Sequence, residues 1–214
     1  MNQHATLTKG ERTRAHIVAT AAGLFWRRNF HGVSVDQVAE AAKVNKATIY
    51  RYFADKNDIA LAVARLNGDM SLDLVFAGSF ADFHAPQDRL AAIYRQVYCA
   101  QAQTLDEDGD VFGCPVVGLA LELGQELPQL REEANKVFEQ VEAMLTQIVR
   151  DAYKTQAVLA DPAPLGRTLT QLLHGAFASA RLAADPNMIL DAGRASLALI
   201  GFPNTRILET EPTK

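Results

Sequence analysis

The run SVDQVAEAAKVNKATIYRYFADKNDIALAV, from Ser34 to Val63, decides the fold of this chain. It begins with Ser34 and has Gln37 three residues later, a capping box that starts a helix. Further on, Asn45 is a capping residue for a second short helix. The segment between the two helices has room only for a tight turn. Two short helices joined by such a turn form a helix-turn-helix, which we place at about residues 34–53.

The second short helix has an inner and an outer face. Ile49 and Phe53 lie one turn apart, and we expect them to face a core. The opposite face carries Ala47, Thr48 and Arg51. A small apolar side chain, a hydroxyl and a guanidinium can all meet base edges in the major groove of DNA. We therefore predict these three residues as DNA base contacts.

Polar and basic side chains surround that face. Tyrosine hydroxyls, lysine ammonium groups and the free N–H groups at a helix start all bind phosphate, and such contacts position a protein on DNA without reading its sequence. The residues predicted as DNA phosphate contacts are Ser34, Lys46, Tyr50, Tyr52 and Lys56. The alternative is that the tyrosines pack against the core and the lysines are only solvated. It applies most to Tyr52.

Helices are also predicted on both sides of the helix-turn-helix. Upstream, residues 11–29 form an amphipathic helix. Its apolar face consists of Ile17, Ala21, Leu24 and Phe25. Downstream, Asp55 caps a fourth helix, with Asp58 three residues on. The N-terminal part is thus a three-helix module that leads directly into another helix.

Apolar residues recur at spacings of three and four through the rest of the chain, and alternating strand patterns are almost absent. Asp161-Pro162 and Asp185-Pro186 each pair a capping side chain with a first-turn proline. An acidic run at residues 106–110 is predicted to be a loop. The helices of this part are predicted at residues 87–104, 116–125, 128–157, 163–184 and 187–201. The predicted fold class is therefore all-α.

Charge is distributed unevenly along the chain. The whole chain carries a formal net charge of -4, whereas the residues up to Asn57 hold nine basic and four acidic side chains. A basic module on an acidic body suits contact with phosphate by the module alone, because the body repels DNA. Chance clustering of charges is the alternative, and charge by itself does not separate the two.

These residues resemble the TetR/AcrR family of transcriptional regulators. The resemblance covers the run from Ser34 to Val63, with its capped helix, turn and Tyr-x-x-Phe ending, and the preceding RTRAHIVATAAGLF, so it spans about sixty residues. Ala47 departs from the family pattern, in which glycine is frequent at this position. The segment GCPVVGLALELGQELPQLREEA, from Gly113 to Ala134, is similar to one branch of the family.

The resemblance implies an N-terminal helix-turn-helix DNA-binding domain followed by a helical-bundle domain for ligand binding and dimerisation. We place the first at residues 1–56 and the second at residues 57–214. It also implies a homodimer on an inverted-repeat operator in double-stranded DNA, and a repressor that a small-molecule effector releases. The effector, the operator and the direction of control cannot be read from the sequence.

In this family the last two helices of each subunit form a four-helix bundle in the homodimer. The predicted helices at residues 163–184 and 187–201 carry an apolar surface broader than one stripe, which fits that arrangement. The residues predicted at the dimer interface are Leu169, Leu173, Phe177, Ala192 and Leu199. The alternative is that these helices are simply buried within one subunit.

The second domain is rich in aromatic side chains. A pocket between helices needs mainly apolar walls and a few polar groups. The candidate effector contacts are Tyr94, Tyr98, Gln171, His174 and Phe177. This composition allows a small, partly apolar effector without identifying it.

Cys114 is a candidate reactive thiol, because it directly precedes Pro115 at an expected helix start, where the helix dipole favours the thiolate. The acidic run just upstream opposes ionisation, and a lone cysteine is often only a small buried hydrophobe. The alternative to a noncovalent effector is therefore a repressor that senses redox state or electrophiles through Cys114. Cys99, within a helix, is the weaker candidate.

Other function classes find little support in the sequence. It has no Walker loop, no Gly-x-Ser-x-Gly and no His-Glu-x-x-His, so we expect neither an enzyme nor a cofactor. The five histidines, one of them His4, lack metal-ligand spacing, and we expect no metal. No signal peptide and no run of about 18 apolar residues is found, so we expect a cytoplasmic protein without membrane contact. A helical scaffold that binds only proteins is a further alternative, against which the outward face of the basic module argues.

Overall fold

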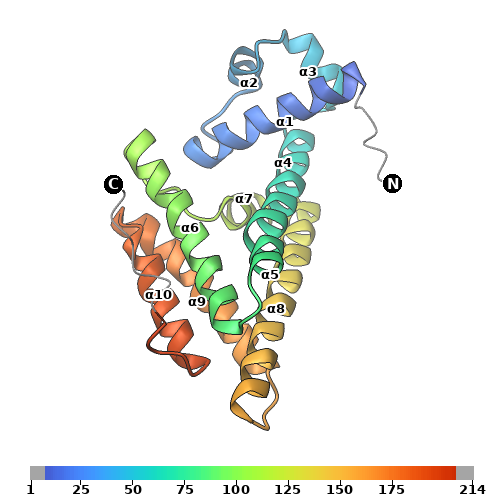
Figure 1. The fold of residues 1–214 in the computed structure, drawn as a ribbon. Helices are drawn as coiled ribbons and strands as arrows, with labels where there is room; N and C mark the ends of the chain where they lie inside the picture. Colours follow the sequence, from blue (N-terminus) through green and yellow to red (C-terminus); the bar gives the residue numbers. More distant parts are fainter. Residues whose placement is uncertain (1–7, 206–214) are drawn as a thin grey trace. The chain divides into compact units, whose positions relative to one another are not determined.

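The computed structural model describes residues 8–205, and every regular element within this range is a helix (Figure 1). The all-α prediction is confirmed. The helices are α1 (Lys9–Arg28), α2 (Val35–Ala41), α3 (Lys46–Tyr52), α4 (Lys56–Met70), the π-helix η1 (Ser71–Ala77), α5 (Gly78–Asp82), α6 (Pro86–Asp108), α7 (Pro115–Leu123), α8 (Pro128–Gln156), α9 (Ala163–Ala183) and α10 (Asn187–Leu199). The predicted helix positions agree with these bounds within a few residues.

Contacts between residues divide the chain into two compact units. The head unit comprises the residues up to Gly68 together with Pro115–Ala134, and the body unit comprises Asp69–Cys114 together with the residues from Asn135 on. This grouping differs from the predicted division after residue 56, because most of α4 and the whole of α7 belong with the head unit. The chain crosses between the units within α4, just before α7 and within α8.

The head unit has its own apolar core. Helices α1, α2, α3, α4 and α7 contribute to it, and the segment after α7 adds Leu130. Its fully buried side chains include Ile17, Val38, Ile49 and Phe53, in agreement with the faces predicted for α1 and α3. Burial of each large apolar side chain stabilises the fold by about 1.5–3 kcal/mol. The helix-turn-helix is therefore held on a packed support that includes a helix from later in the chain.

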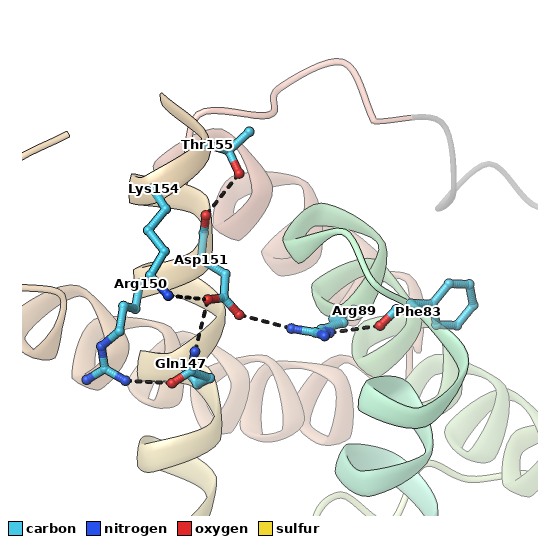
Figure 2. A network of polar contacts seen from close by, with 7 residues as sticks. All are labelled: Phe83, Arg89, Gln147, Arg150, Asp151, Lys154 and Thr155. Carbon is cyan, nitrogen blue, oxygen red and sulfur yellow. Dashed lines mark hydrogen bonds and ion pairs between the residues drawn. The ribbon is translucent and has the colours of Figure 1, made fainter. Parts of the chain in front are cut away.

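The body unit is built around α6, α8, α9 and α10, with α10 lying against both α9 and α6 (Figure 1). A polar network ties α6 to α8 (Figure 2). In it, Arg89 donates to an Asp151 carboxylate oxygen at 3.0 Å and to the Phe83 carbonyl at 2.8 Å. Burial opposes ionisation of Asp151, but hydrogen bonds from Gln147 and Lys154 and the charges of Lys154 and Arg89 lower its pKa below the usual value.

Helix ends follow the local capping signals in most places. Asp161 and Asp185 each accept a backbone N–H from two residues on, as the Asp-Pro pairs predict. The acidic run was predicted to be a loop, and that prediction is wrong for its first three residues. Helix α6 continues to Asp108 and ends at Gly109, whose φ of 74° suits a residue without a side chain.

Candidate DNA-binding interface

Helix α2 begins as its sequence predicts. The Ser34 hydroxyl accepts the Gln37 N–H at 3.2 Å, and the Gln37 side chain accepts the Ser34 N–H at 2.7 Å. Both partners of the capping box are therefore satisfied. The Ser34 hydroxyl hydrogen is the group that is left to donate to a phosphate.

The turn after α2 and the start of α3 are short and closely determined. Lys43 adopts a left-handed φ of 53°, and the Val44 N–H donates to the Ala39 carbonyl at 3.0 Å. Asn45 caps α3, because its side-chain oxygen accepts both the N–H and the hydroxyl hydrogen of Thr48 at 2.7 Å. These bonds fix α3 on the surface of the head unit at its N-terminal end.

Helix α3 presents the predicted base contacts on its outer side. Ala47 and Arg51 are exposed, Thr48 is half-buried, and Tyr50 is 49% exposed. Ile49 is fully buried beneath them. The Thr48 hydroxyl donates to Asn45, so its methyl group and remaining lone pair are what it offers to a base. The face therefore combines an apolar contact, an acceptor and a guanidinium.

Two side chains next to this face are already engaged on the protein surface. Lys46 donates to Asp36 at 2.9 Å, and this hydrogen bond raises the pKa of Lys46. Arg51 lies over the Tyr52 ring, with its guanidinium 5.0 Å from the ring centroid. Tyr52 is half-buried and packs against the head core, which agrees with the packing alternative for this residue. A phosphate would compete with Asp36 for the Lys46 ammonium.

Lys56 departs from the prediction of a phosphate contact. Its ammonium donates to the Phe30 carbonyl and lies 3.8 Å from the centroid of the Phe30 ring. Desolvation lowers the pKa of Lys56, while the charge of Glu122 raises it. The ammonium thus holds the turn after α1, and we correct its assignment to a structural one.

Glu122 is a functional candidate that the sequence analysis missed. Its carboxylate accepts the N–H groups of Phe30 and His31, at 2.8 and 2.9 Å. The signal that could have found it is its isolation, since Glu122 is the one charged residue in the sequence of α7, PVVGLALEL. Charged residues are rarely placed in such an apolar helix without a partner.

The predicted effector contacts do not all lie together in the body unit. Tyr94 is buried in the core, where its hydroxyl pairs with that of Ser196 at 2.7 Å, and burial raises its pKa to about 12. Tyr98 is half-buried against the same core. Gln171 is exposed and lines a groove of about 430 Å³ between α9 and α10 that also contains Ala192. These positions remove Tyr94 from the candidate effector contacts and set Gln171 apart from it.

His174 and Phe177 do lie together, on the side of α9 that meets α8. The His174 ring stacks on Phe138 with 4.1 Å between centroids, and the Phe177 centroid is 6.3 Å away. Both ring nitrogens of His174 are buried and have no hydrogen-bond partner within the described residues. A buried polar group without a partner is uncommon and calls for a physical explanation.

The structure also corrects the predicted dimer interface. Leu169 and Leu173 are 0% and 2% exposed inside the body core, so they cannot contact a second copy. Phe177 is half-buried and packs against the same core. Leu199 is 49% exposed and Ala192 lines the α9–α10 groove, so these two stay available. The residues missed are on the opposite face of α9.

Cys114 lies directly before the first residue of α7, as predicted. It is half-buried and not disulfide-bonded, whereas Cys99 on α6 is exposed. The preceding residue, Gly113, exchanges two hydrogen bonds with the buried side chain of Gln101, at 2.9 and 3.3 Å. The backbone that carries the thiol is therefore firmly placed.

Two further searches of residues 8–205 gave negative results. No group of three or more histidine, cysteine or acidic side chains is arranged to hold a metal ion, and His4 lies outside the described residues. None of the helices in this range combines the length and the apolar character that crossing a bilayer requires.

Two family models match the chain. The model described as bacterial regulatory proteins of the tetR family matches residues 17–63, which include the helix-turn-helix. The model described as the C-terminal domain of tetracyclin repressor-like proteins matches residues 86–196. Together they cover both parts of the predicted domain organisation.

Individual proteins are similar over most of the chain. The HTH-type transcriptional repressor NemR of Escherichia coli K12 is 26% identical over 190 residues, which are 86% of this chain and 87% of that protein. The regulator RutR of the same organism is 37% identical over 71 residues, which are 30% of this chain and 34% of RutR.

Solved structures show the same fold. The reduced form of E. coli NemR has a TM-score of 0.77 at 22% identity, covering 91% of this chain and all of that one. The regulatory protein TetR from Rhodobacter sphaeroides has a TM-score of 0.75 at 24% identity, covering 86% and 96% of the two chains. With both family models matched and the helix-turn-helix in place, the chain belongs to the TetR family and is a DNA-binding transcriptional regulator.

Proposed function

We propose that this regulator is a repressor that binds an inverted-repeat operator as a homodimer and leaves it when a small molecule binds the body unit. The observation that carries the proposal is the outer face of α3, where Ala47, Thr48 and Arg51 stand over the buried Ile49. It acts in the cytoplasm, as a binding protein and not as an enzyme. Relatives named as repressors support the direction of control.

The proposed dimer uses the outer face of α9 and α10. On this face Leu182 is 90% exposed and Leu199 is 49% exposed, and small residues such as Gly175 leave room for a partner helix. Large apolar side chains that are exposed on one face favour association. A second copy on this face would give an isologous interface and bring two reading helices to one operator.

The proposed effector site includes His174, Phe177 and Phe138. Burial lowers the pKa of His174 to about 4, so the imidazole is neutral near pH 7 and offers one donor and one acceptor. Neither is used within the described residues. A small, flat, partly apolar molecule with a hydroxyl or carbonyl group would satisfy it.

Arg51→Ala is expected to separate base reading from positioning. If Arg51 bonds a guanine with both arms of its guanidinium, its loss weakens operator binding by about 1–3 kcal/mol and relaxes the preference at one base pair. Lys46→Ala should weaken binding to all sequences alike and reduce the salt slope by about one, because it removes a phosphate contact. Salt titrations on operator and single-mismatch DNA measure both effects.

Arg51→Lys is the matched control for this pair. It keeps the charge and loses the planar fork, so it should retain the salt slope of the native protein and still relax the base preference. Unchanged base preferences in both Arg51 variants would refute the assignment of Arg51 as a base contact.

A second candidate is a repressor whose signal is covalent chemistry at Cys114. It is favoured by the half-buried thiol on a backbone that Gln101 holds in place, directly before α7. The E. coli NemR structure is described as a reduced form, so that relative has distinguishable redox states. In this reading, modification of the thiol replaces the noncovalent effector.

Treatment with a maleimide distinguishes the two candidates. If Cys114 is the sensor, the native protein and Cys99→Ser release the operator on modification, whereas Cys114→Ser stays bound. Cys99→Ser is the matched control because Cys99 is the more exposed of the two thiols. Equal release from all three proteins, or release from none, would exclude Cys114 and leave the noncovalent effector.

A further inference from the structure

We infer that Glu122 is a positioning residue for DNA binding, whose carboxylate holds the turn between α1 and α2 and thereby fixes the helix-turn-helix in the geometry that reads DNA. The inference requires only that the protein binds DNA. It does not depend on the effector or on the direction of control proposed above.

The contact is a two-point clamp. The Phe30 N–H donates to one carboxylate oxygen of Glu122 at 2.8 Å, and the His31 N–H donates to the other at 2.9 Å. The Glu122 side chain is only 20% exposed, so water competes weakly for these bonds. Hydrogen bonds to an ionised acceptor are roughly twice as strong as neutral ones. A single side chain from α7 therefore satisfies two successive backbone donors of the turn.

The same turn is held from a second side. Lys56, at the start of α4, donates to the carbonyl of Phe30, whose N–H is bonded to Glu122. A β-carbon at Gly32 would collide with the Arg28 carbonyl oxygen, so the turn also folds tightly back on the end of α1. Helices α1, α4 and α7 thus meet at one short segment, and the loss of one contact leaves the others in place.

This segment leads directly into the DNA-reading element. Val33 is buried in the head core, and its N–H donates to the Phe30 carbonyl at 3.2 Å. The next residue, Ser34, is the N-cap of α2, and α3 packs against α2. A displaced turn therefore moves the start of α2, and α3 with it.

The clamp also gives the body unit a second covalent route to the reading helices. The chain leaves the body unit at Cys114 and enters α7 at Pro115, two helical turns before Glu122. A change at this crossing acts on the turn through Glu122, whereas a change at the crossing within α4 acts from the side of Lys56.

The test compares Glu122→Ala and Glu122→Gln with the native protein. The ligands are an operator selected from random DNA with the native chain and a random duplex of the same length. Removal of an acid, taken alone, strengthens binding to both duplexes, because it removes repulsion from phosphate. Loss of positioning instead weakens operator binding by about fivefold or more while random-duplex binding does not fall.

Glu126→Ala is the matched control. It removes the same charge from an exposed position on the segment after α7, within the same unit. It should change the operator and random-duplex affinities in parallel. The ratio of the two affinities is the decisive readout, since a variant that is only less stable loses both in proportion to its unfolded fraction.

Hydrogen exchange at the Phe30 and His31 amides shows whether the clamp is broken. Both amides should exchange faster in the Glu122 variants and remain protected in Glu126→Ala. If Glu122→Ala does not fold, Glu122→Gln decides, because its side chain keeps one oxygen acceptor. Unchanged exchange at both amides, or faster exchange with an unchanged affinity ratio, would overturn the inference.

Discussion

Lowering the pH from about 6.5 to about 4 is expected to reduce the free energy of unfolding by about 3 kcal/mol through His174 alone. Burial lowers the pKa of this histidine in the folded protein to about 4 from an ordinary value of 6.5. Between these values the unfolded chain binds a proton that the folded chain does not. Stability is therefore complete above pH 6.5 and decreases as the pH falls through this window.

His174→Phe should abolish this part of the pH dependence. The substituted ring keeps the stack on Phe138 and has no buried nitrogen without a partner, so the variant should be at least as stable as the native protein at pH 7.5. The measurement is denaturant unfolding of both proteins at several pH values from 7.5 to 4, as a difference between the two curves.

His84→Gln is the control, because His84 is an exposed histidine of the same unit. Its curve should follow that of the native protein. A constant difference between native protein and His174→Phe across the whole pH range would contradict the buried, neutral state of His174.

Local signals could be predicted well because a cap involves only residues close in sequence. The Ser34 capping box, the Asn45 cap and the Asp55 side chain that accepts the Asp58 N–H at 2.8 Å all form as expected. The same signature was overlooked at Thr8, which forms a capping box with Glu11 and starts α1 two residues early. That omission is one of attention to the sequence and not of physics.

Other features depend on contacts that the sequence does not display. The π-helix η1 spans SLDLVFA, whose apolar spacing is that of an ordinary helix. Lys56 reads as a surface lysine, and only the folded chain brings Phe30, 26 positions upstream, beneath its ammonium. His174 and Gln171 lie one turn apart, yet one meets α8 and the other lines the α9–α10 groove. Which side of a helix is buried depends on its neighbours.

For the dimer interface, periodicity identified apolar residues but not the face they belong to. Leu169 and Leu173 are the most apolar positions of their helix and are used in the core of the body unit. The face left for a partner carries small residues and the exposed Leu182. A helix that packs on both sides uses its largest residues inside its own unit first, which a pattern alone does not indicate.

The binding of a full operator is expected to be about a hundredfold tighter than that of one half-site. Two heads joined in a dimer make the second contact intramolecular, and such linkage raises affinity by about 10²–10⁴-fold. The centres of the half-sites should lie about 34–36 Å apart, or a multiple of that distance, so that both α3 helices enter major grooves on one face of the duplex. Insertion of about five base pairs turns the second half-site to the opposite face and should remove the gain.

The measurement that tests this account most directly is selection of bound sequences from random DNA, followed by titration of the selected site, its half-site and the five-base-pair insertion. The account predicts an inverted repeat, a full site about a hundredfold tighter than the half-site, and loss of that difference on insertion. Enrichment of no sequence, or a selected site without symmetry that binds no tighter than either half, would contradict it.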